Sequence, residues 1–437
     1  MKECFDHRAL EFRKPDIIRA AQEILLKEQI GHISGNSPYY GKLFSDQTID
    51  PSSINLASLS TVPFTGKSDL EVHNEDFFAV SPSRVVDTVL SSGTTGKPTQ
   101  VIYTEHDLRR LAYNEELSFL SCGLSADDTV LLTCTMDRCF VAGLAYFLGL
   151  RNIGATAIRN GVSSFSSHLG IIRRMKPGVI IGVPSFLRKL ALFIQSEGVD
   201  PKGLGIKKLI CVGEPLRDRE LGLLKLSEQV EELWGAKAFS TYASSETVTT
   251  FCECTAQNGG HLHPELAVAE IVSEEGEVLP SGETGEVVIT PLCLEGMPLL
   301  RFKTGDISFL IDEPCACGRN SQRLGPILGR KKQMIKYRGT TLYPQAIYAV
   351  MDGIPAVNEY YVVITSDYDL SDIVRVYVSV NDSSLSSADV GDRLQAQLRV
   401  RPEVVILSDE EVRKQVCSAK SRKLIRFIDM RENNEVP

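Results

Sequence analysis

The sequence lacks any apolar run long enough to span a membrane. Its longest uninterrupted apolar stretch extends roughly from Phe140 to Leu150, well short of the ~20 residues that a transmembrane helix requires. The opening segment MKECFDHRALEFRK also lacks the apolar core of a secretory signal. We therefore expect neither membrane insertion nor export, and we expect a cytoplasmic location.

An excess of basic residues is also missing. The chain carries 47 Lys and Arg against 56 Asp and Glu, a formal net charge of −9. This balance gives no electrostatic reason to expect nucleic acid or an anionic membrane as a partner. Internal repeats and low-complexity linkers are absent as well. A chain of 437 residues is nevertheless too long for one small core, so two or more domains are expected.

The 11 cysteines do not suggest a disulfide framework, because their number is odd. Most stand singly in apolar surroundings, as Cys122, Cys134 and Cys211 do. In the absence of an export signal, this distribution indicates reduced thiols in a cytoplasm.

The first two thirds of the chain alternate between strand and helix patterns. We predict helices over 15–31 and 104–122, turn chemistry from Asn36, and a series of strand–turn–helix units after residue 128. Two of these units begin near Gly178 and at 206–216, each with a turn and then a helix directly after its strand. The segment 236–246 is a further strand ending in a polar tip. Such alternation favours parallel α/β layers, in which ligands gather at the carboxyl ends of strands.

From about Ala267 the pattern changes to short strands, which predict a β-rich subdomain. The basic, glycine-bounded segment 329–339 follows as a connector. Beyond it, helix and strand patterns predict a small α+β domain. The expected fold class is therefore α/β, with a large N-terminal domain of layered sheets and helices over 1–330. A small, mobile α+β domain over 331–437 completes it.

The stretch SSGTTGKP, residues 91–98, is suited to holding phosphate. Its glycines can take positive φ angles, and without a Cβ the backbone N–H groups can close on an anion. Hydroxyls and one lysine add donors. It is not a Walker A loop, because its glycines are closer together and Pro98 follows the lysine. Strand-like flanks predict a strand–loop–strand hairpin gripping a triphosphate, and an ordinary Gly/Thr-rich turn is the alternative.

Two carboxylates occupy turn-like positions. Glu246 closes TYASSE at a predicted strand end, where one carboxylate beside hydroxyls suits Mg²⁺; a solvated acidic turn is the alternative. Asp306 in RFKTGD follows a strand and shares a turn with Gly305, where it could accept both hydroxyls of a ribose or simply cap the turn. Lys423 lies in a basic tail, and the composition of this tail does not by itself indicate which lysine has a function.

Six soft or borderline metal ligands fall in two tight groups after residue 250. Structural zinc takes four thiolate and imidazole ligands, and two from each group would join the two segments. The predicted set is Cys254, His261, Cys315 and Cys317, with Cys252 and His263 as alternates. Four protein ligands leave no open position, so a catalytic zinc is disfavoured, and unligated thiols remain the alternative.

Several motifs together resemble the acyl-adenylate-forming enzymes. The shared motifs are SSGTTGKP (91–98), GEP (213–215), YASSE (242–246), RFKTGD (301–306), GRKKQMIKYRG (329–339) and the tail around Lys423. The chain is similar to the phenylacetate–coenzyme A ligase branch in VPFTGKSDL (62–70), GVPSFLRKL (182–190), GMPLLRFKTGD, PCACGR and RGTTLYPQAI (338–347). The resemblance covers nearly the whole chain.

The resemblance implies an AMP-forming acid–thiol ligase with ATP, Mg²⁺ and coenzyme A as cofactors and a small carboxylic acid as substrate. A carboxylate attacks the α-phosphate of ATP, and the coenzyme A thiol then displaces AMP. A related branch uses a deazaflavin acceptor, and a carrier-protein thiol is another alternative. A third alternative to the ligase is a nucleotide-binding relative that has lost catalysis. Relatives are often dimeric, so a homodimer is a candidate assembly.

The resemblance also implies roles for individual residues. It assigns catalytic roles to Lys423, Glu246, Ser245 and Lys97. It assigns nucleotide contacts and the hinge to Ser91, Ser92, Gly93, Thr94, Thr95, Gly96, Gly213, Glu214, Pro215, Tyr242, Ala243, Asp306, Arg330 and Lys332. The Cys-x6-His plus Cys-x-Cys pattern matches bacterial members of the branch, which implies a structural zinc.

Two positions depart from the family pattern. Ala243 stands where glycine is usual, which narrows the space beside the acyl group, and Lys303 replaces an arginine. We assign the acyl-pocket wall to Phe140, Val141 and Pro184, together with Ala243. This apolar, compact wall favours an aromatic or small hydrophobic acid over a long fatty acid.

Overall fold

The computed structural model describes residues 9–91, 98–337, 340–366, 372–382, 384–417 and 425–431. The chain divides into two compact units. The larger comprises Met1–Leu223 with Ser227–Ile327, and the smaller comprises Leu224–Leu226 with Leu328–Pro437. The division after Ile327 lies close to the boundary expected at residue 330.

The main sheet of the larger unit has the order β14-β15-β10-β9-β8-β7-β6-β4-β5. Its parallel part consists of β4 (Thr129–Leu132), β5 (Thr156–Arg159), β6 (Val179–Gly182), β7 (Lys208–Val212) and β8 (Lys237–Ser244). Antiparallel strands extend it: β9 (Thr249–Glu253), β10 (Gly260–His261), β14 (Leu310–Ile311) and β15 (Arg323–Leu324). The parallel α/β layer is therefore confirmed, and the antiparallel extension was not predicted.

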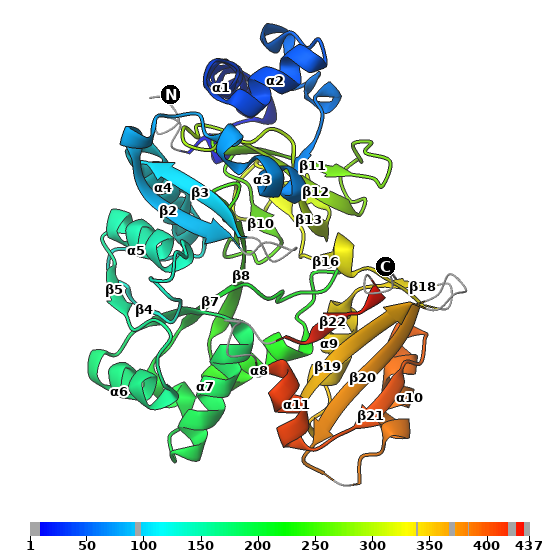
Figure 1. The fold of residues 1–437 in the computed structure, drawn as a ribbon. Helices are drawn as coiled ribbons and strands as arrows, with labels where there is room; N and C mark the ends of the chain where they lie inside the picture. The colour runs from blue at the N-terminus through cyan, green and yellow to red at the C-terminus, as the bar shows by residue number, and fades with distance from the viewer. Residues whose placement is uncertain are drawn as a thin grey trace. The chain divides into compact units, whose positions relative to one another are not determined.

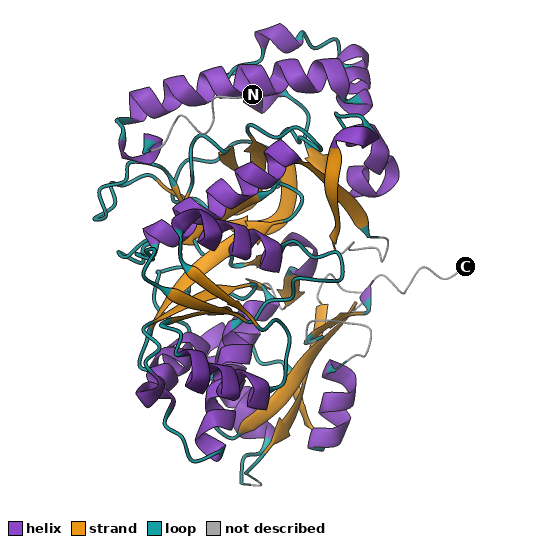
Figure 2. Ribbon diagram, turned by 90° about the vertical axis from the view of Figure 1, so that its left-hand side faces the viewer, coloured by secondary structure: helices purple, strands orange, loops and turns teal. Residues whose placement is uncertain are grey.

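Helices alternate with the parallel strands and lie outside them (Figures 1 and 2). They are α4 (Glu105–Ser121), α5 (Ala142–Ile153), α6 (Phe165–Met175), α7 (Pro184–Ser196) and α8 (Lys225–Trp234). The expectation of a helix directly after the 213–215 turn was wrong. The chain first makes a turn in which the Asp218 carboxylate accepts a hydrogen bond from the Gly222 N–H at 2.8 Å. Leu221 adopts a φ of 66° there, which a helix does not tolerate.

The β-rich part of the larger unit is a second sheet in the order β1-β13-β12-β11. Its strands are β1 (Thr65–Gly66), β11 (Ala267–Val272), β12 (Gly285–Pro291) and β13 (Phe302–Ser308). Asp306 does not follow this strand, as the sequence suggested, but lies within β13. The register jumps there from Val288↔Lys303 to Glu286↔Ile307, and Gly305 has a φ of 78°. A bulge inside a strand therefore replaces the expected turn.

Three helices and a hairpin complete the N-terminal part: α1 (Pro15–Asn36), α2 (Pro38–Asp46), α3 (Lys67–His73), β2 (Val85–Ser91) and β3 (Thr99–Thr104). The turn expected from Asn36 is instead helix α2. Pro38 suits its first position, and Tyr40 and Phe44 lie one helical turn apart on a buried face. Burial of these two rings outweighs the local turn propensity.

The smaller unit is an α+β domain with a sheet in the order β21-β20-β19-β22. The strands of the whole unit, inside and outside this sheet, are β16 (Gly329–Arg330), β17 (Ile335–Tyr337), β18 (Thr340–Leu342), β19 (Val357–Ser366), β20 (Asp372–Val380), β21 (Glu403–Ile406) and β22 (Phe427–Asp429). Its helices are α9 (Pro344–Asp352), α10 (Ser387–Leu398) and α11 (Asp409–Val416). The predicted fold class is confirmed. Within the described ranges no helix combines the length and apolarity needed to cross a membrane.

Candidate active site and metal cluster

The phosphate-loop motif is framed by the predicted hairpin. Strands β2 and β3 pair antiparallel, and Ser91, the buried last residue of β2, lies opposite Thr99. Ser92, Gly93, Thr94, Thr95, Gly96 and Lys97 lie outside the described residues. The Leu90 N–H donates to the Cys139 carbonyl oxygen at 2.9 Å, which ties the hairpin to the segment before α5. The strand frame is thus confirmed, and the phosphate contacts stay a prediction.

Three of the other predicted motifs of the larger unit lie at the carboxyl ends of neighbouring strands of the main sheet. Strands β6, β7 and β8 are parallel neighbours, so their carboxyl ends meet. Pro184 begins the helix after β6, Gly213–Pro215 follow β7, and Tyr242–Ser245 occupy the end of β8 and the turn after it. Gly213 has a φ of 80°, the left-handed conformation that glycine adopts without strain.

Glu246 lies beside this edge and is only 7% exposed. Its carboxylate accepts a hydrogen bond from the Ser244 hydroxyl at 3.0 Å, and Lys67 Nζ lies 3.7 Å from its other oxygen. Lys67 was not among the site residues predicted from the sequence. Its only signal was its place in VPFTGKSDL, where the structure puts it at the start of α3. A cation thus lies close to the carboxylate at which the sequence predicts Mg²⁺.

Tyr242 brings two predicted motifs into contact. Its hydroxyl donates a 2.8 Å hydrogen bond to Asp306 Oδ2, joining YASSE at the end of β8 to the bulge of β13. Burial, with the nearby Asp306 charge, raises the pKa of Tyr242 well above its usual value. The hydroxyl is therefore protonated at neutral pH and orients the carboxylate that we expected at the ribose.

The residues assigned to the acyl-pocket wall come from separate turns. Val141 belongs to the main core cluster, and Val183, next to Pro184, packs against the same cluster. Phe140 is half-buried, whereas Ala243 is exposed at the end of β8 and pairs with Thr250. Val141 and Val183 thus border one apolar region, and the pocket role of Phe140 and Pro184 stays a prediction.

Two predicted site residues lie in the connector of the smaller unit. Arg330 ends β16, and Lys332 lies in the short 3-10 turn Lys331–Gln333, both exposed. The Arg431 guanidinium donates to the carbonyl oxygens of Met334 at 2.8 Å and Lys332 at 3.4 Å, which fixes this segment to β22. Lys423 lies outside the described residues.

Four soft ligands converge where the two cysteine groups meet. The ligand atoms of Cys254, His261, Cys315 and Cys317 all lie within 4.8 Å of one another. Cys254 follows β9, His261 lies on β10, and the other two lie between β14 and β15. The Cys254 and Cys315 sulfurs are 3.6 Å apart, and Cys317 Sγ lies 3.4 Å from His261 Nε2.

The chemistry of this donor set fits a zinc ion. Three thiols and one imidazole match a four-coordinate structural site. His261 Nδ1 lies 3.1 Å from the Ser321 hydroxyl, a partner that holds the ring with Nε2 toward the sulfurs. Burial is the main cause that lowers the pKa of His261 to about 3, so the imidazole is neutral, the form that binds metal.

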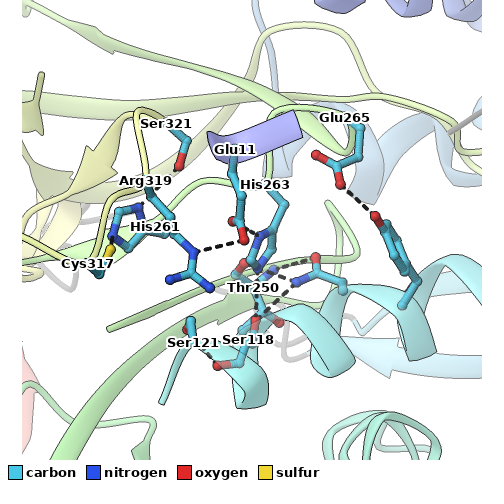
Figure 3. A network of polar contacts seen from close by, with 12 residues as sticks. Glu11, Ser118, Ser121, Thr250, His261, His263, Glu265, Cys317, Arg319 and Ser321 are labelled. Atoms are coloured by element: carbon cyan, nitrogen blue, oxygen red, sulfur yellow. Dashed lines mark hydrogen bonds and ion pairs between the residues drawn. The ribbon is translucent and has the colours of Figure 1, made fainter. Parts of the chain in front are cut away.

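The two alternate ligands point elsewhere. Cys252 Sγ lies 3.2 Å from Cys122 Sγ in the core. The ring nitrogens of His263 lie 3.2 Å from Glu11 and 3.2 Å from Ser118, as Figure 3 shows. Neither residue belongs to the four-ligand group, so the arrangement of the side chains favours the set that the sequence predicted over its alternates.

The segment that carries Cys315 and Cys317 also contacts the residue Glu11 near the start of the described chain. Arg319, two residues after Cys317, forms a 2.8 Å ion pair with Glu11 (Figure 3). The Asn320 N–H donates to the Glu11 carbonyl oxygen at 2.7 Å. Glu11 in turn contacts His263, so a buried polar network links the cluster, the N-terminal segment and α4.

Two models of known protein families match the sequence. The AMP-binding enzyme family matches residues 45–294, and the AMP-binding enzyme C-terminal domain matches residues 339–431. A phenylacetate–coenzyme A ligase of Thermus thermophilus is 33% identical over 379 residues, covering 85% of this chain and 84% of that protein. The corresponding enzyme of Pseudomonas putida is 30% identical, covering 88% of this chain and 86% of its own.

Solved structures extend the likeness to the fold. A 2-hydroxyisobutyryl-CoA ligase in the postadenylation state has a TM-score of 0.83 at 22% identity, covering 95% of this chain and 90% of that one. The same ligase in the thioesterification state, with 2-HIB-AMP and CoA, has a TM-score of 0.70 at 23% identity, covering 96% and 91%. Taken with the matches over both parts of the sequence, these observations show that the chain belongs to the AMP-binding enzyme family.

Proposed function

We propose that this chain is an ATP-dependent carboxylate–coenzyme A ligase that acts on an aryl or similarly small hydrophobic acid. The observation that carries the proposal is the meeting of the family motifs at one sheet edge, where Tyr242 joins the end of β8 to Asp306. The phenylacetate–coenzyme A ligase names of the relatives support the acid class. The apolar surroundings of Val141 and of Val183, the residue before Pro184, support it as well.

The proposed reaction has two steps. In the first, a carboxylate oxygen of the acid attacks the α-phosphorus of ATP, the bond to the β-phosphate oxygen breaks, and pyrophosphate leaves. In the second, the sulfur of coenzyme A attacks the acyl carbon of the acyl-AMP. The thiol proton is lost, the acyl–oxygen bond breaks, and AMP leaves with the thioester formed.

This chain's own residues orient the reactants. Asp306, held by Tyr242, would bind the ribose, and the turn at Gly213–Pro215 would border the adenine. Glu246 would hold Mg²⁺, which neutralises phosphate charge when bound, with Ser245 near the α-phosphate and Lys67 facing the same region. The 91–97 segment would grip the β- and γ-phosphates. Most of the rate enhancement would come from positioning and charge neutralisation.

The smaller unit would supply the lysine that bridges the carboxylate and the α-phosphate. We assign this role to Lys423, with Arg330 assisting at the ribose and Lys332 at the pivot of the unit. Withdrawal of the lysine after adenylation would open the way for coenzyme A. Lys423→Ala should therefore slow adenylation far more than thiolysis of supplied acyl-AMP, and equal losses in both half-reactions would overturn this assignment.

The deciding experiment measures pyrophosphate release with ATP and Mg²⁺ across a panel of aryl and short aliphatic acids, with and without coenzyme A. Release that depends on one acid and turns over only with coenzyme A establishes the ligase. Release that stops after one turnover despite coenzyme A retains the adenylation chemistry but requires another acceptor. Absence of release with every acid, in a chain that binds ATP, contradicts catalysis.

A further inference from the structure

The first turn of α7 has no cap of its own. Val183 occupies the N-cap position without a side-chain hydrogen bond, and Pro184 at the next position has no N–H to offer. The first available donor is therefore the N–H of Ser185. A helix start of this kind leaves backbone donors that require an acceptor from elsewhere.

Glu214 provides that acceptor from the neighbouring strand end. Its Oε2 accepts the Ser185 N–H at 2.9 Å, and its Oε1 accepts the Ser185 hydroxyl at 2.7 Å. Strands β6 and β7 are parallel neighbours, with Gly182 opposite Cys211, so the two turns meet at one edge. The positive φ of Gly213 allows the chain to turn just before the glutamate.

The geometry has an electrostatic and a positional consequence. A carboxylate at a helix N-terminus is favoured by the helix dipole and by the charge-assisted hydrogen bonds. Both oxygens of Glu214 accept hydrogen bonds from Ser185, so the side chain is directed at the start of α7. The backbone of the Gly213–Pro215 turn is thereby fixed against the helix that begins at Pro184.

We propose that Glu214 is a positioning residue that couples the nucleotide turn to the acyl-pocket wall. It acts through Ser185: the turn that would border adenine and the helix start that carries Pro184 are held as one body. This inference rests on the proposed function, because it takes its two endpoints from it. It changes the role expected for Glu214 from a nucleotide contact to the link between two subsites.

The main test compares ATP affinity and kinetics in Glu214→Ala, Glu214→Gln and Ser185→Ala. Glu214→Ala should weaken ATP binding by about tenfold, because without the bonds to Ser185 the Gly213–Pro215 turn would adopt its binding conformation only about a tenth of the time. It should raise the KM values for ATP and for the acid together, with a smaller change in kcat. Glutamine retains an acceptor for the Ser185 N–H, so Glu214→Gln should keep most of the ATP affinity. If the alanine variant does not fold, the comparison of Glu214→Gln with wild type still tests the proposal.

A matched control separates positioning from simple loss of a helix cap. Ser164 caps the adjacent helix α6 by accepting the Ser167 N–H at 3.2 Å. Ser164→Ala removes a cap without touching the turn after β7, so it should lower thermal stability and leave ATP affinity unchanged. An equal loss of ATP affinity in this control would overturn the proposal.

Two further measurements distinguish coupling from direct contact. Because Glu214 and Ser185 act as a unit, the double alanine variant should bind ATP no more weakly than Glu214→Ala alone; additive losses would contradict this. Purine riboside triphosphate lacks the 6-amino group of ATP. The affinity ratio of the two nucleotides should be the same in wild type and Glu214→Ala, and a change in that ratio would show direct base recognition instead.

The readout also separates this inference from the ligase proposal. ATP binding by titration calorimetry requires no acid and no turnover. A wild-type chain that binds ATP but releases no pyrophosphate loses the proposed activity, while the Glu214 coupling is still decided by affinity. A wild-type chain that binds no ATP overturns both.

Discussion

The Tyr242 hydroxyl donates a 2.8 Å hydrogen bond to Asp306 Oδ2 and so joins two sheets of the larger unit. Tyr242 lies two residues before the end of β8 in the main sheet, whereas Asp306 lies in the bulge of β13. The bulge turns the aspartate toward the tyrosine, and burial with the Asp306 charge keeps the phenol protonated by raising its pKa. The contact therefore sets the orientation of a carboxylate proposed to bind ribose.

Tyr242→Phe should weaken ATP binding by roughly tenfold, because the Asp306 carboxylate would no longer be held in the orientation proposed to bind ribose. It should also reduce the preference for ATP over 2′,3′-dideoxy-ATP, which lacks the hydroxyls that Asp306 would accept. Tyr360→Phe is a matched control, because Tyr360 donates a 2.9 Å hydrogen bond to Asp352 in the smaller unit. An unchanged nucleotide preference in Tyr242→Phe would contradict the ribose role.

Lys67 should contribute charge to the triphosphate region. Its ammonium lies 3.7 Å from Glu246 and is only partly exposed, so it faces the same space as the proposed metal ligand. Lys67→Ala should slow pyrophosphate release at saturating ATP by about tenfold or more. Lys27 Nζ lies 3.7 Å from Glu23 Oε1 on α1 and provides a control with the same separation between the charged atoms. Equal rates in the two alanine variants would assign Lys67 a purely structural role.

Much of the site was predictable because its signals are local. The frame of the phosphate loop follows from β-branched flanks around a glycine run, and the hairpin of β2 and β3 confirms it. The ligand set centred on Cys254 and His261 follows from soft donors in two tight groups, which the structure brings together. A site whose residues are close together in the sequence can be recognised before the fold is known.

What the sequence did not predict depends on contacts between distant residues. Helix α2 looked like a turn because Asn, Ser, Pro and Gly favour turns locally, and only burial of Tyr40 and Phe44 reveals the helix. The partner of Glu214 is 29 residues away in the chain, so no local pattern points to Ser185. The Asp306 bulge likewise depends on pairing between β12 and β13.

The four-ligand group should hold about one zinc per chain, and two cysteines that are close in sequence offer a direct test. Cys254→Ala removes a member of the group, whereas Cys252→Ala changes a thiol that packs against Cys122. Elemental analysis should find zinc lost in the first variant and retained in the second. The midpoint temperature of thermal unfolding should fall much further for Cys254→Ala than for Cys252→Ala, because metal binding contributes folding free energy. Loss of zinc from both variants, or its absence from wild type, would contradict the assignment.

A buried acid on α4 should make stability depend on pH. Glu115 is 1% exposed, and its Oε1 accepts a hydrogen bond from the Thr250 hydroxyl at 2.5 Å. Burial is the dominant cause that raises its pKa from 4.5 to about 7, while the Thr250 hydrogen bond and the His263 charge act in the opposite direction. Between these two values the folded chain holds a proton that the unfolded chain has lost.

This difference in bound protons fixes the direction in which the free energy of unfolding changes with pH. The neutral carboxyl stabilises the fold relative to the ionised one, so the free energy of unfolding falls as pH rises through the window from about 4.5 to about 7 and is level above it. Glu115→Gln, which keeps an acceptor for Thr250 and cannot ionise, should lose this slope. Between pH 6 and pH 8, wild type should lose on the order of 1 kcal/mol relative to the variant in denaturant unfolding. Glu274→Gln at an exposed position controls for the removal of one carboxylate, and parallel pH profiles for wild type and Glu115→Gln would show that Glu115 does not titrate in this window.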